Sequence, residues 1–220
     1  MREKHQDSPR DRTLDVTEIF ASIQGEGPFM GRPASFVRLS GCVEPLCPWC
    51  DTKHAWGPGD AIPVNQVADT VRNLGNDLVV ITGGEPFLQW ASGLNHLEDQ
   101  LLKKGLTVQY ETSGKVLIPA EVKGVKVCSP KHLDGRWHYI QKNSNRADYF
   151  KFVVKDDFKG VEGFVKDQGL GANRVWIMPL GDHGEDQLAL SPDIWAFCVK
   201  KRFNFSPRLH TLFFNNKQGV

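Results

Sequence analysis

The sequence predicts an α/β fold with a mostly parallel sheet, arranged as an incomplete, TIM-like (β/α)6 barrel. Segments with the pattern of a β-strand alternate with segments that have the periodicity of an amphipathic helix, which is typical of a parallel sheet covered by helices. About six such units fit into the chain, too few for a complete eight-fold barrel. Short motifs containing glycine or proline follow most of the strand segments.

The individual elements follow from local patterns. Runs of apolar and β-branched residues predict strands at 16–23, 35–40, 78–81, 106–110, 125–128, 149–154 and 174–178. The first helix opens at Pro63, places five apolar residues on one face and stops at Gly75. Further helices are predicted at 94–102, 157–168 and 193–201, and a final segment at 205–214 follows them.

The whole chain fits one domain at 13–220, preceded by a polar flexible leader at 1–12. The formal net charge of +1 gives no electrostatic footprint for nucleic acid or for an anionic membrane. No apolar run approaches the roughly 20 residues that span a bilayer, and the charged start lacks the apolar stretch of a secretory signal. We therefore expect a cytoplasmic protein that binds neither nucleic acid nor membranes.

The polar motifs fall just after strands. They are Gln24-Gly25-Glu26-Gly27, Gly41-Cys42, Thr82-Gly83-Gly84-Glu85-Pro86, Glu111-Thr112-Ser113-Gly114, Ser129-Pro130-Lys131 and Pro179-Leu180-Gly181. In parallel α/β folds the carboxyl ends of the strands share one edge, where chemistry takes place. We expect these motifs to meet at one surface.

Three of the five cysteines, Cys42, Cys47 and Cys50, lie within nine positions, which favours a metal site over a disulfide framework. An iron–sulfur cluster held by three thiolates is one interpretation. A zinc site completed by His54, a plant-type ferredoxin cluster and three unligated thiols are the alternatives. Cys128 and Cys198 are expected to be buried core residues.

The segment Cys47-Pro48-Trp49-Cys50-Asp51-Thr52, together with the GGEP motif at 83–86, resembles the radical S-adenosylmethionine signature. Within that superfamily the chain is most similar to the 7-carboxy-7-deazaguanine synthase family of queuosine biosynthesis. The supporting segments include 18–27, 31–38, 50–54, 111–114 and 129–131, with a weaker match at 206–210. The resemblance thus covers most of the chain.

The resemblance implies a magnesium-dependent carbon–nitrogen lyase. It would use a [4Fe–4S] cluster and S-adenosylmethionine to convert 6-carboxy-5,6,7,8-tetrahydropterin to 7-carboxy-7-deazaguanine, with loss of ammonia. It also implies a homodimer and a flavodoxin or ferredoxin as electron donor. A glycyl-radical activase that acts on a protein partner, and a non-catalytic Cys3His zinc module, are the alternative functions.

Roles for individual residues follow from the same resemblance. The cluster ligands would be Cys42, Cys47 and Cys50, and Thr52 would bind Mg²⁺, unless Asp51 and Thr52 only cap a turn. Contacts to S-adenosylmethionine would come from Gly83, Gly84, Glu85, Ser113, Ser129, Pro130, Lys131, Met178 and Pro179. Substrate contacts would come from Ile23, Gln24, Gly25, Arg38, Thr82 and His210.

Three features of the sequence stand apart from this assignment. Arg38 is a charge in an apolar strand and needs a partner, which is either the substrate carboxylate or an internal ion pair. Lys151 lies in another apolar strand, where we expect it to serve packing. The family usually spaces its first two cysteines by three residues, whereas four intervene here, at 43–46.

Overall fold

The computed structural model describes residues 12–215 and 217–220, and these form a nine-stranded sheet. The strands are β1 (Thr13–Ile23), β2 (Pro33–Leu39), β3 (Asp60–Pro63), β4 (Leu78–Gly83), β5 (Thr107–Thr112), β6 (Val125–Cys128), β9 (Tyr149–Val154), β10 (Val175–Pro179) and β11 (Asn204–Phe205). Their order is β11-β10-β9-β6-β5-β4-β2-β1-β3. From β2 to β11 all neighbours are parallel, whereas β1 is antiparallel to both β2 and β3. The predicted mostly parallel α/β sheet is confirmed.

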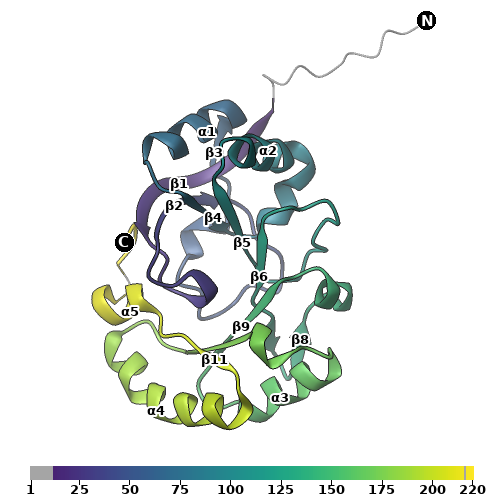
Figure 1. The fold of residues 1–220 in the computed structure, drawn as a ribbon, viewed down its shortest axis with the longest axis vertical. Helices are drawn as coiled ribbons and strands as arrows, with labels where there is room; N and C mark the ends of the chain where they lie inside the picture. Colours follow the sequence, from purple (N-terminus) through teal and green to yellow (C-terminus); the bar gives the residue numbers. More distant parts are fainter. Residues whose placement is uncertain (1–11, 216) are drawn as a thin grey trace, which may run out of the picture.

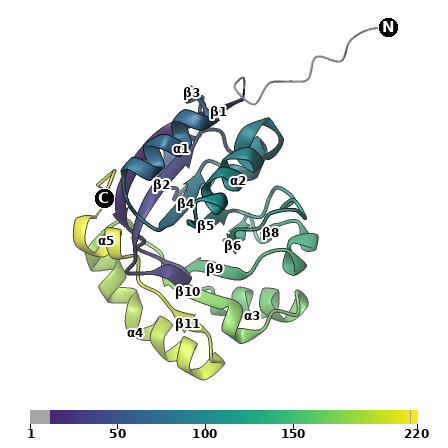
Figure 2. The same ribbon diagram turned by 45° about the horizontal axis from the view of Figure 1, so that its top comes forward.

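Among the described residues, four of the five α-helices lie on the outer side of the curved sheet, and the last one lies beside the fourth, next to the cavity described below (Figures 1 and 2). In chain order they are α1 (Val64–Asn73), α2 (Asn95–Lys103), α3 (Phe158–Asp167), α4 (Gly184–Lys201) and α5 (Leu209–Phe214). The crossovers from β5 to β6 and from β6 to β9 contain no α-helix, and the second holds a hairpin of β7 (Lys131–Leu133) and β8 (Arg136–His138). Short helical turns lie at Gly27–Phe29, Lys53–Ala55, Pro86–Gln89, Trp90–Leu94, Gln141–Asn145 and Ala172–Arg174.

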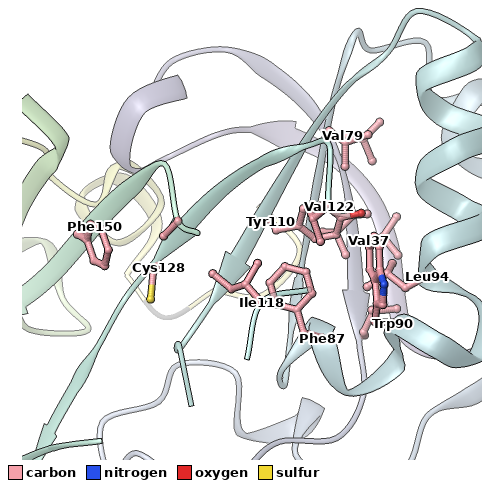
Figure 3. Packing of buried hydrophobic residues seen from close by; sticks show 14 of the residues in the cluster. Val37, Val79, Phe87, Trp90, Leu94, Tyr110, Ile118, Val122, Cys128 and Phe150 are labelled. Carbon is pink, nitrogen blue, oxygen red and sulfur yellow. The ribbon is translucent and has the colours of Figure 1, made fainter. Parts of the chain in front are cut away.

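Alternation along the strands separates the core from the site. Successive side chains of a strand point to opposite faces, and one set is buried beneath the helices. This set includes Val37 on β2, Val79 on β4, Tyr110 on β5 and Phe150 on β9 (Figure 3). The alternate residues of the same strands are left for the inner face of the sheet. Cys128 and Cys198 are buried, as expected.

The last long helix departs from the sequence expectation. We predicted a helix at 193–201, whereas α4 begins at Gly184 and runs through Pro192. Proline lacks an N–H and normally breaks a helix interior, so the segment before it carries little helical signal. The predicted final segment, 205–214, consists of the end of β11 and the helix α5.

The predicted leader at 1–12 lies outside the described residues except for Arg12, whose carbonyl oxygen accepts a hydrogen bond from Val64 N at 3.0 Å. Among the described residues, no helix has both the length and the apolar character needed to cross a membrane.

Candidate active site at the carboxyl edge of the sheet

A cavity of about 270 Å³ opens at the carboxyl ends of the parallel strands. The side chains that alternate with the core residues point into it, among them Phe36 and Arg38 from β2, Thr82 from β4 and Lys151 from β9. The cysteine loop and the chain after α5 supply the remaining walls. The motifs that follow the strands therefore meet at one surface, as expected.

Most of the residues that the sequence singled out line this cavity. They are Ile23, Gln24, Gly25, Arg38, Cys42, Cys47, Cys50, Thr52, Thr82, Gly83, Gly84, Ser113, Ser129, Lys131, Met178 and His210. Three others do not line it: Glu85, Pro130 and Pro179 are buried behind it. The cavity wall thus contains every predicted cluster and magnesium ligand and most of the predicted cosubstrate contacts.

The GGEP loop is packed directly on the start of the cysteine loop. A Cβ on Gly84 would lie 1.6 Å from Gly41 O, and a Cβ on Gly83 would lie 2.0 Å from Leu39 O. Gly83 also has a φ of 121°, which side chains rarely adopt. Glu85 N donates to Gly41 O at 2.8 Å. These glycines are needed for the contact between the two loops as well as for a backbone wall of the cavity.

The cysteine loop is held from the opposite side by a lysine that the sequence analysis did not single out. Lys115 Nζ donates to Val43 O at 3.3 Å and to Pro45 O at 2.5 Å. Both carbonyls belong to the lengthened spacer between the first two cysteines. Burial raises the pKa of the Cys42 thiol, and the charge of Lys115 opposes that rise. The spacer is therefore fixed by charge-assisted hydrogen bonds.

The donor set of this loop fits an iron–sulfur cluster better than a zinc ion. A zinc ion with Zn–S distances of about 2.3 Å keeps tetrahedral ligands within about 3.8 Å of one another. Among the described residues, the only set of His, Cys, Asp or Glu ligand atoms all within 4.8 Å comes from Asp182, His183 and Asp186, all exposed. The sulfurs of Cys42, Cys47 and Cys50 therefore do not all lie within 4.8 Å of one another. His54 is engaged elsewhere, with Nε2 3.4 Å from Glu18 and Nδ1 3.2 Å from Gln218.

Buried charges form the floor of the cavity. Lys151 Nζ lies 2.7 Å from Glu26 Oε2 and 2.7 Å from Glu111 Oε2. Arg208 Nε lies 3.1 Å from Glu26 Oε1, and its Nη2 is paired with Asp51. The packing role expected for Lys151 is wrong, because its ammonium joins two carboxylates at a side chain that is only 5% exposed.

The two carboxylates that share Lys151 differ in acidity. Burial would raise the pKa of Glu26, but Lys151 and Arg208 hold it well below its usual value. Burial raises the pKa of Glu111, which is paired with Lys151 and lies near the charge of Glu26. Of the two carboxylates, Glu111 therefore takes up a proton more readily than Glu26.

Gln24 and His210 extend the same network. Gln24 Nε2 lies 3.4 Å from Glu111 Oε1, and His210 Nε2 lies 3.6 Å from Glu26 Oε1. A Cβ on Gly25 would lie 2.6 Å from His210 Nδ1, so the imidazole packs on a residue that has no side chain. Burial lowers the pKa of His210. The imidazole is thus held against the cavity wall near Glu26.

Arg38 has an internal partner and still faces the cavity. Its Nε donates to Glu18 Oε1 at 2.6 Å, and its Nη1 donates to Thr52 Oγ1 at 3.4 Å. Thr52 Oγ1 in turn donates to Asp51 Oδ1 at 2.6 Å. Hydroxyl and carboxylate oxygens are the donors that Mg²⁺ takes in proteins. The site therefore places suitable oxygen atoms beside a guanidinium at the cavity wall.

The strand-end loops on the other wall are joined by polar contacts. Glu85 Oε2 accepts from Ser113 N at 2.9 Å and from Ser113 Oγ at 2.6 Å, and its Oε1 accepts from Thr112 Oγ1 at 2.7 Å. Burial raises the pKa of the Glu85 carboxyl. Lys131 Nζ donates to Ser129 Oγ at 2.8 Å. The carboxylate of Glu85 therefore orients the ETSG loop from behind the wall.

The charged floor was missed although its members lie in the motifs that were noted. Glu26, Glu111 and Arg208 fall inside the segments 18–27, 111–114 and 206–210, which carried the resemblance. The sequence does indicate that Lys151 needs a partner, because a charge in an apolar strand is costly to bury, as for Arg38. Its partners are far away in sequence, so the ion pairs could not be read from local spacing.

Comparison with known proteins gives a consistent set of relatives, although no family model matches. A 7-carboxy-7-deazaguanine synthase from Hyperthermus butylicus is 40% identical over 93% of this chain and 94% of its own length. One from Pyrobaculum aerophilum is 36% identical over 96% of this chain and 98% of its own. The crystal structure of QueE from Escherichia coli matches with a TM-score of 0.73 and 25% identity over 90% of this chain and 95% of that chain.

The similarity to these relatives extends over more than nine-tenths of the chain. This chain belongs to the 7-carboxy-7-deazaguanine synthase family.

Proposed function

We propose that this chain is the radical S-adenosylmethionine lyase that converts 6-carboxy-5,6,7,8-tetrahydropterin to 7-carboxy-7-deazaguanine with loss of ammonia. The observation that supports this most directly is the placement of three free cysteines on the wall of the cavity whose floor holds Lys151 and Glu111. Family membership supports the same reaction. The glycyl-radical activase and the zinc module are not favoured by the names of the relatives.

Cys42, Cys47 and Cys50 would hold a [4Fe–4S] cluster through their thiolates. Three protein ligands leave one iron for S-adenosylmethionine, and when bound the pair supplies reductive cleavage of a carbon–sulfur bond and so a hydrogen-abstracting group. Lys115 keeps the loop in place through its two carbonyl contacts. The protein contributes position and shielding to this step.

The wall formed by the GGEP, ETSG and SPK loops is assigned to S-adenosylmethionine. Backbone at Gly83 and Gly84 faces the cavity without side chains. Ser113, Ser129 and Lys131 present hydroxyl and ammonium groups that suit a ribose and a carboxylate. In this proposal Glu85 is a positioning residue, because its carboxylate holds Ser113 and does not line the cavity. Met178 adds an apolar contact, and Pro130 and Pro179 shape the loops from behind.

The charged floor is assigned to the pterin. A 2-aminopyrimidinone edge offers N–H donors, and Glu111 and Gln24, which line this part of the cavity, carry side-chain oxygen atoms that can accept them. Arg38 offers Nη2, which has no hydrogen-bond partner among the described residues, to the substrate carboxylate. Ile23, Gly25, Thr82 and His210 complete the substrate side of the cavity.

Thr52 is assigned to Mg²⁺, with Asp51 beside it. Mg²⁺ keeps several waters and takes few protein oxygens, so one hydroxyl together with a substrate oxygen suits it. Arg38 and an Mg²⁺ held by Thr52 would both offset the negative charge of the substrate carboxylate.

Three wider assignments come from the family resemblance. We propose that a flavodoxin or ferredoxin reduces the cluster, that the protein is a homodimer, and that it works in the cytoplasm without nucleic-acid or membrane partners. The balanced charge of +1 agrees with the last of these.

The test is anaerobic reconstitution with iron and sulfide, followed by incubation with S-adenosylmethionine, reductant, Mg²⁺ and the tetrahydropterin. We expect 5′-deoxyadenosine and 7-carboxy-7-deazaguanine in the products. Formation of 5′-deoxyadenosine without the deazaguanine would reject the proposed substrate.

Two serine variants link the product to the cysteine loop. Cys47→Ser should lose the iron and the activity, whereas Cys198→Ser, a buried cysteine on α4, should keep both. Equal iron in the two variants would reject the proposed cluster ligands.

A further inference from the structure

Helix α4 has an apolar stripe on its solvent-facing side. Its inner side is buried against β10 and β11, and the helix lies at the periphery of the molecule (Figure 1). On the outer side Leu188 is 66% exposed, Trp195 is 61% exposed and Val199 is 69% exposed. Scattered exposed apolar residues need no explanation, but a stripe along one helix indicates an interaction surface.

The spacing of this stripe is regular. The residues 185, 188, 192, 195, 199 and 202 are separated by alternating steps of three and four, the spacing of a seam between two helices. The exposed residues Ala189 and Ala196 flank the seam without adding charge or bulk. For comparison, the exposed side of α1 carries Asn65, Gln66 and Asp69. A seam of this kind is thus not a general feature of the outer helices.

Most charges of α4 lie at its two ends, and the exposed Asp193 is the one charged residue between them. Glu185 and Asp186 lie in the first turn of α4, and Lys200 and Lys201 lie in the last, followed by Arg202. The seam is also complementary to a second copy of itself that runs in the opposite direction. Leu188 then faces Val199, Pro192 faces Trp195, and Glu185 faces Arg202.

We infer that a second copy of this chain packs its α4 antiparallel against α4, with Leu188, Trp195 and Val199 at the centre of the contact. The inference deepens the homodimer proposed above by naming its contact face. A two-fold axis near residues 193 and 194 makes each acidic end meet a basic end, as an isologous contact requires. Packing of seam residues at alternating steps of three and four corresponds to a shallow crossing of about 20°.

This charge arrangement favours a second copy over a redox protein. An acidic electron donor would need a basic docking surface, and one end of this stripe is acidic. Neighbouring α5 adds apolar surface beside α4. Its Phe213 is 69% exposed and its Phe214 is 51% exposed, and the α5-capping Asn215 accepts from Gly184 N at 2.8 Å.

The test measures mass against concentration by light scattering on the anaerobically reconstituted protein. We expect a dimer for the unaltered chain. Trp195→Glu and, separately, Val199→Glu should each raise the dissociation constant at least about 30-fold, as expected for residues at the centre of an interface. Leu117→Glu, at an exposed leucine away from α4, should leave it unchanged. Thermal unfolding checks that each variant is folded, since Trp195 also contacts Phe205.

A charge exchange tests the antiparallel register. Glu185→Arg or Arg202→Glu alone should weaken the dimer about tenfold, and the double exchange should restore it. Both new charges oppose the dipole of α4, so restoration cannot come from a more stable helix. A monomer at all concentrations, a dimer indifferent to Trp195→Glu and Val199→Glu, or a double exchange that stays dissociated would overturn the inference. Product formation is measured separately, so failure of the lyase assay with an intact dimer would count against the proposed function alone.

Discussion

Replacing Lys151 by methionine removes the cation that Glu26 and Glu111 share while keeping the length of the side chain. The ammonium is 2.7 Å from each carboxylate, and its side chain is 5% exposed. Removing one partner of a buried ion pair costs about 3–5 kcal/mol, because the remaining charge stays buried without compensation. For a chain of this size that loss lowers the unfolding temperature by roughly 6–20 °C.

The loss should depend on pH, and its sign can be worked out. Burial already raises the pKa of Glu111, and without Lys151 the pKa rises further. A carboxyl group whose folded pKa exceeds its unfolded value binds more protons in the folded state, so it destabilises the fold as pH rises through the folded pKa. Lys151→Met should therefore be most destabilising above neutral pH and should recover stability toward pH 5.

Denaturant unfolding between pH 5 and 8 measures the effect. Lys123→Met is the matched control, because its partner Asp99 and Lys123 itself are exposed, and such pairs contribute about 0–1 kcal/mol. The double variant Lys151→Met/Glu111→Gln should regain part of the loss. A loss below about 1 kcal/mol, or one that is the same at every pH, would refute the idea that Lys151 compensates two buried charges.

Three further perturbations address other parts of the site. Gly25→Ala should displace His210 and lower product formation at least tenfold, because the new Cβ would lie 2.6 Å from Nδ1, whereas Gly163→Ala, with no atom within 4 Å of its Cβ, should leave the assay unchanged. Lys115→Met should lower the reduction potential of the cluster in a redox titration, since a positive charge near it is lost; iron loss without a potential change would point to a purely structural role. Acidification from pH 7.5 to 5 should lower the free energy of unfolding less in His210→Gln than in the unaltered chain. The buried ring has a lowered pKa, so the histidine of the unfolded state binds a proton at higher pH than that of the folded state, and this destabilises the unaltered fold. Identical dependence of unfolding free energy on pH in the two proteins would contradict this.

Local pattern predicted most of the sheet because each strand carries its own signal. Strands β6 and β9 lie where apolar runs placed them, and the first helix has the expected face. The edge strand β3 and the start of α4 were missed for physical reasons. β3 is only four residues long and pairs with β1 at the edge of the sheet, and Pro192 conceals a helix that tertiary packing stabilises.

Part of the site can likewise be predicted from local sequence, and part of it cannot. The cysteines and the glycine loops are recognisable because the chemistry requires particular residues at close spacing. The pairing of Lys151 with Glu26 and Glu111 is different, since it joins three strand-end segments that only the folded sheet brings together. A charge in an apolar strand signals that a partner exists, but the register of the sheet decides which one it is.

The longer spacer between Cys42 and Cys47 shows how little such a departure costs. Lengthening the spacer from three to four residues adds about 0.2–0.3 kcal/mol of closure entropy. Hydrogen bonds on either side of the spacer offset this cost. Gly41 N donates to Ala55 O at 2.9 Å, and Cys50 N donates to Cys47 O at 3.0 Å. Lys115 adds two charge-assisted hydrogen bonds to the spacer itself, and bonds to charged groups contribute about 1.5–3 kcal/mol each. The extra residue is therefore compatible with an ordered loop because its carbonyls have a cation to bind, and deletion of one spacer residue should matter less than loss of Lys115.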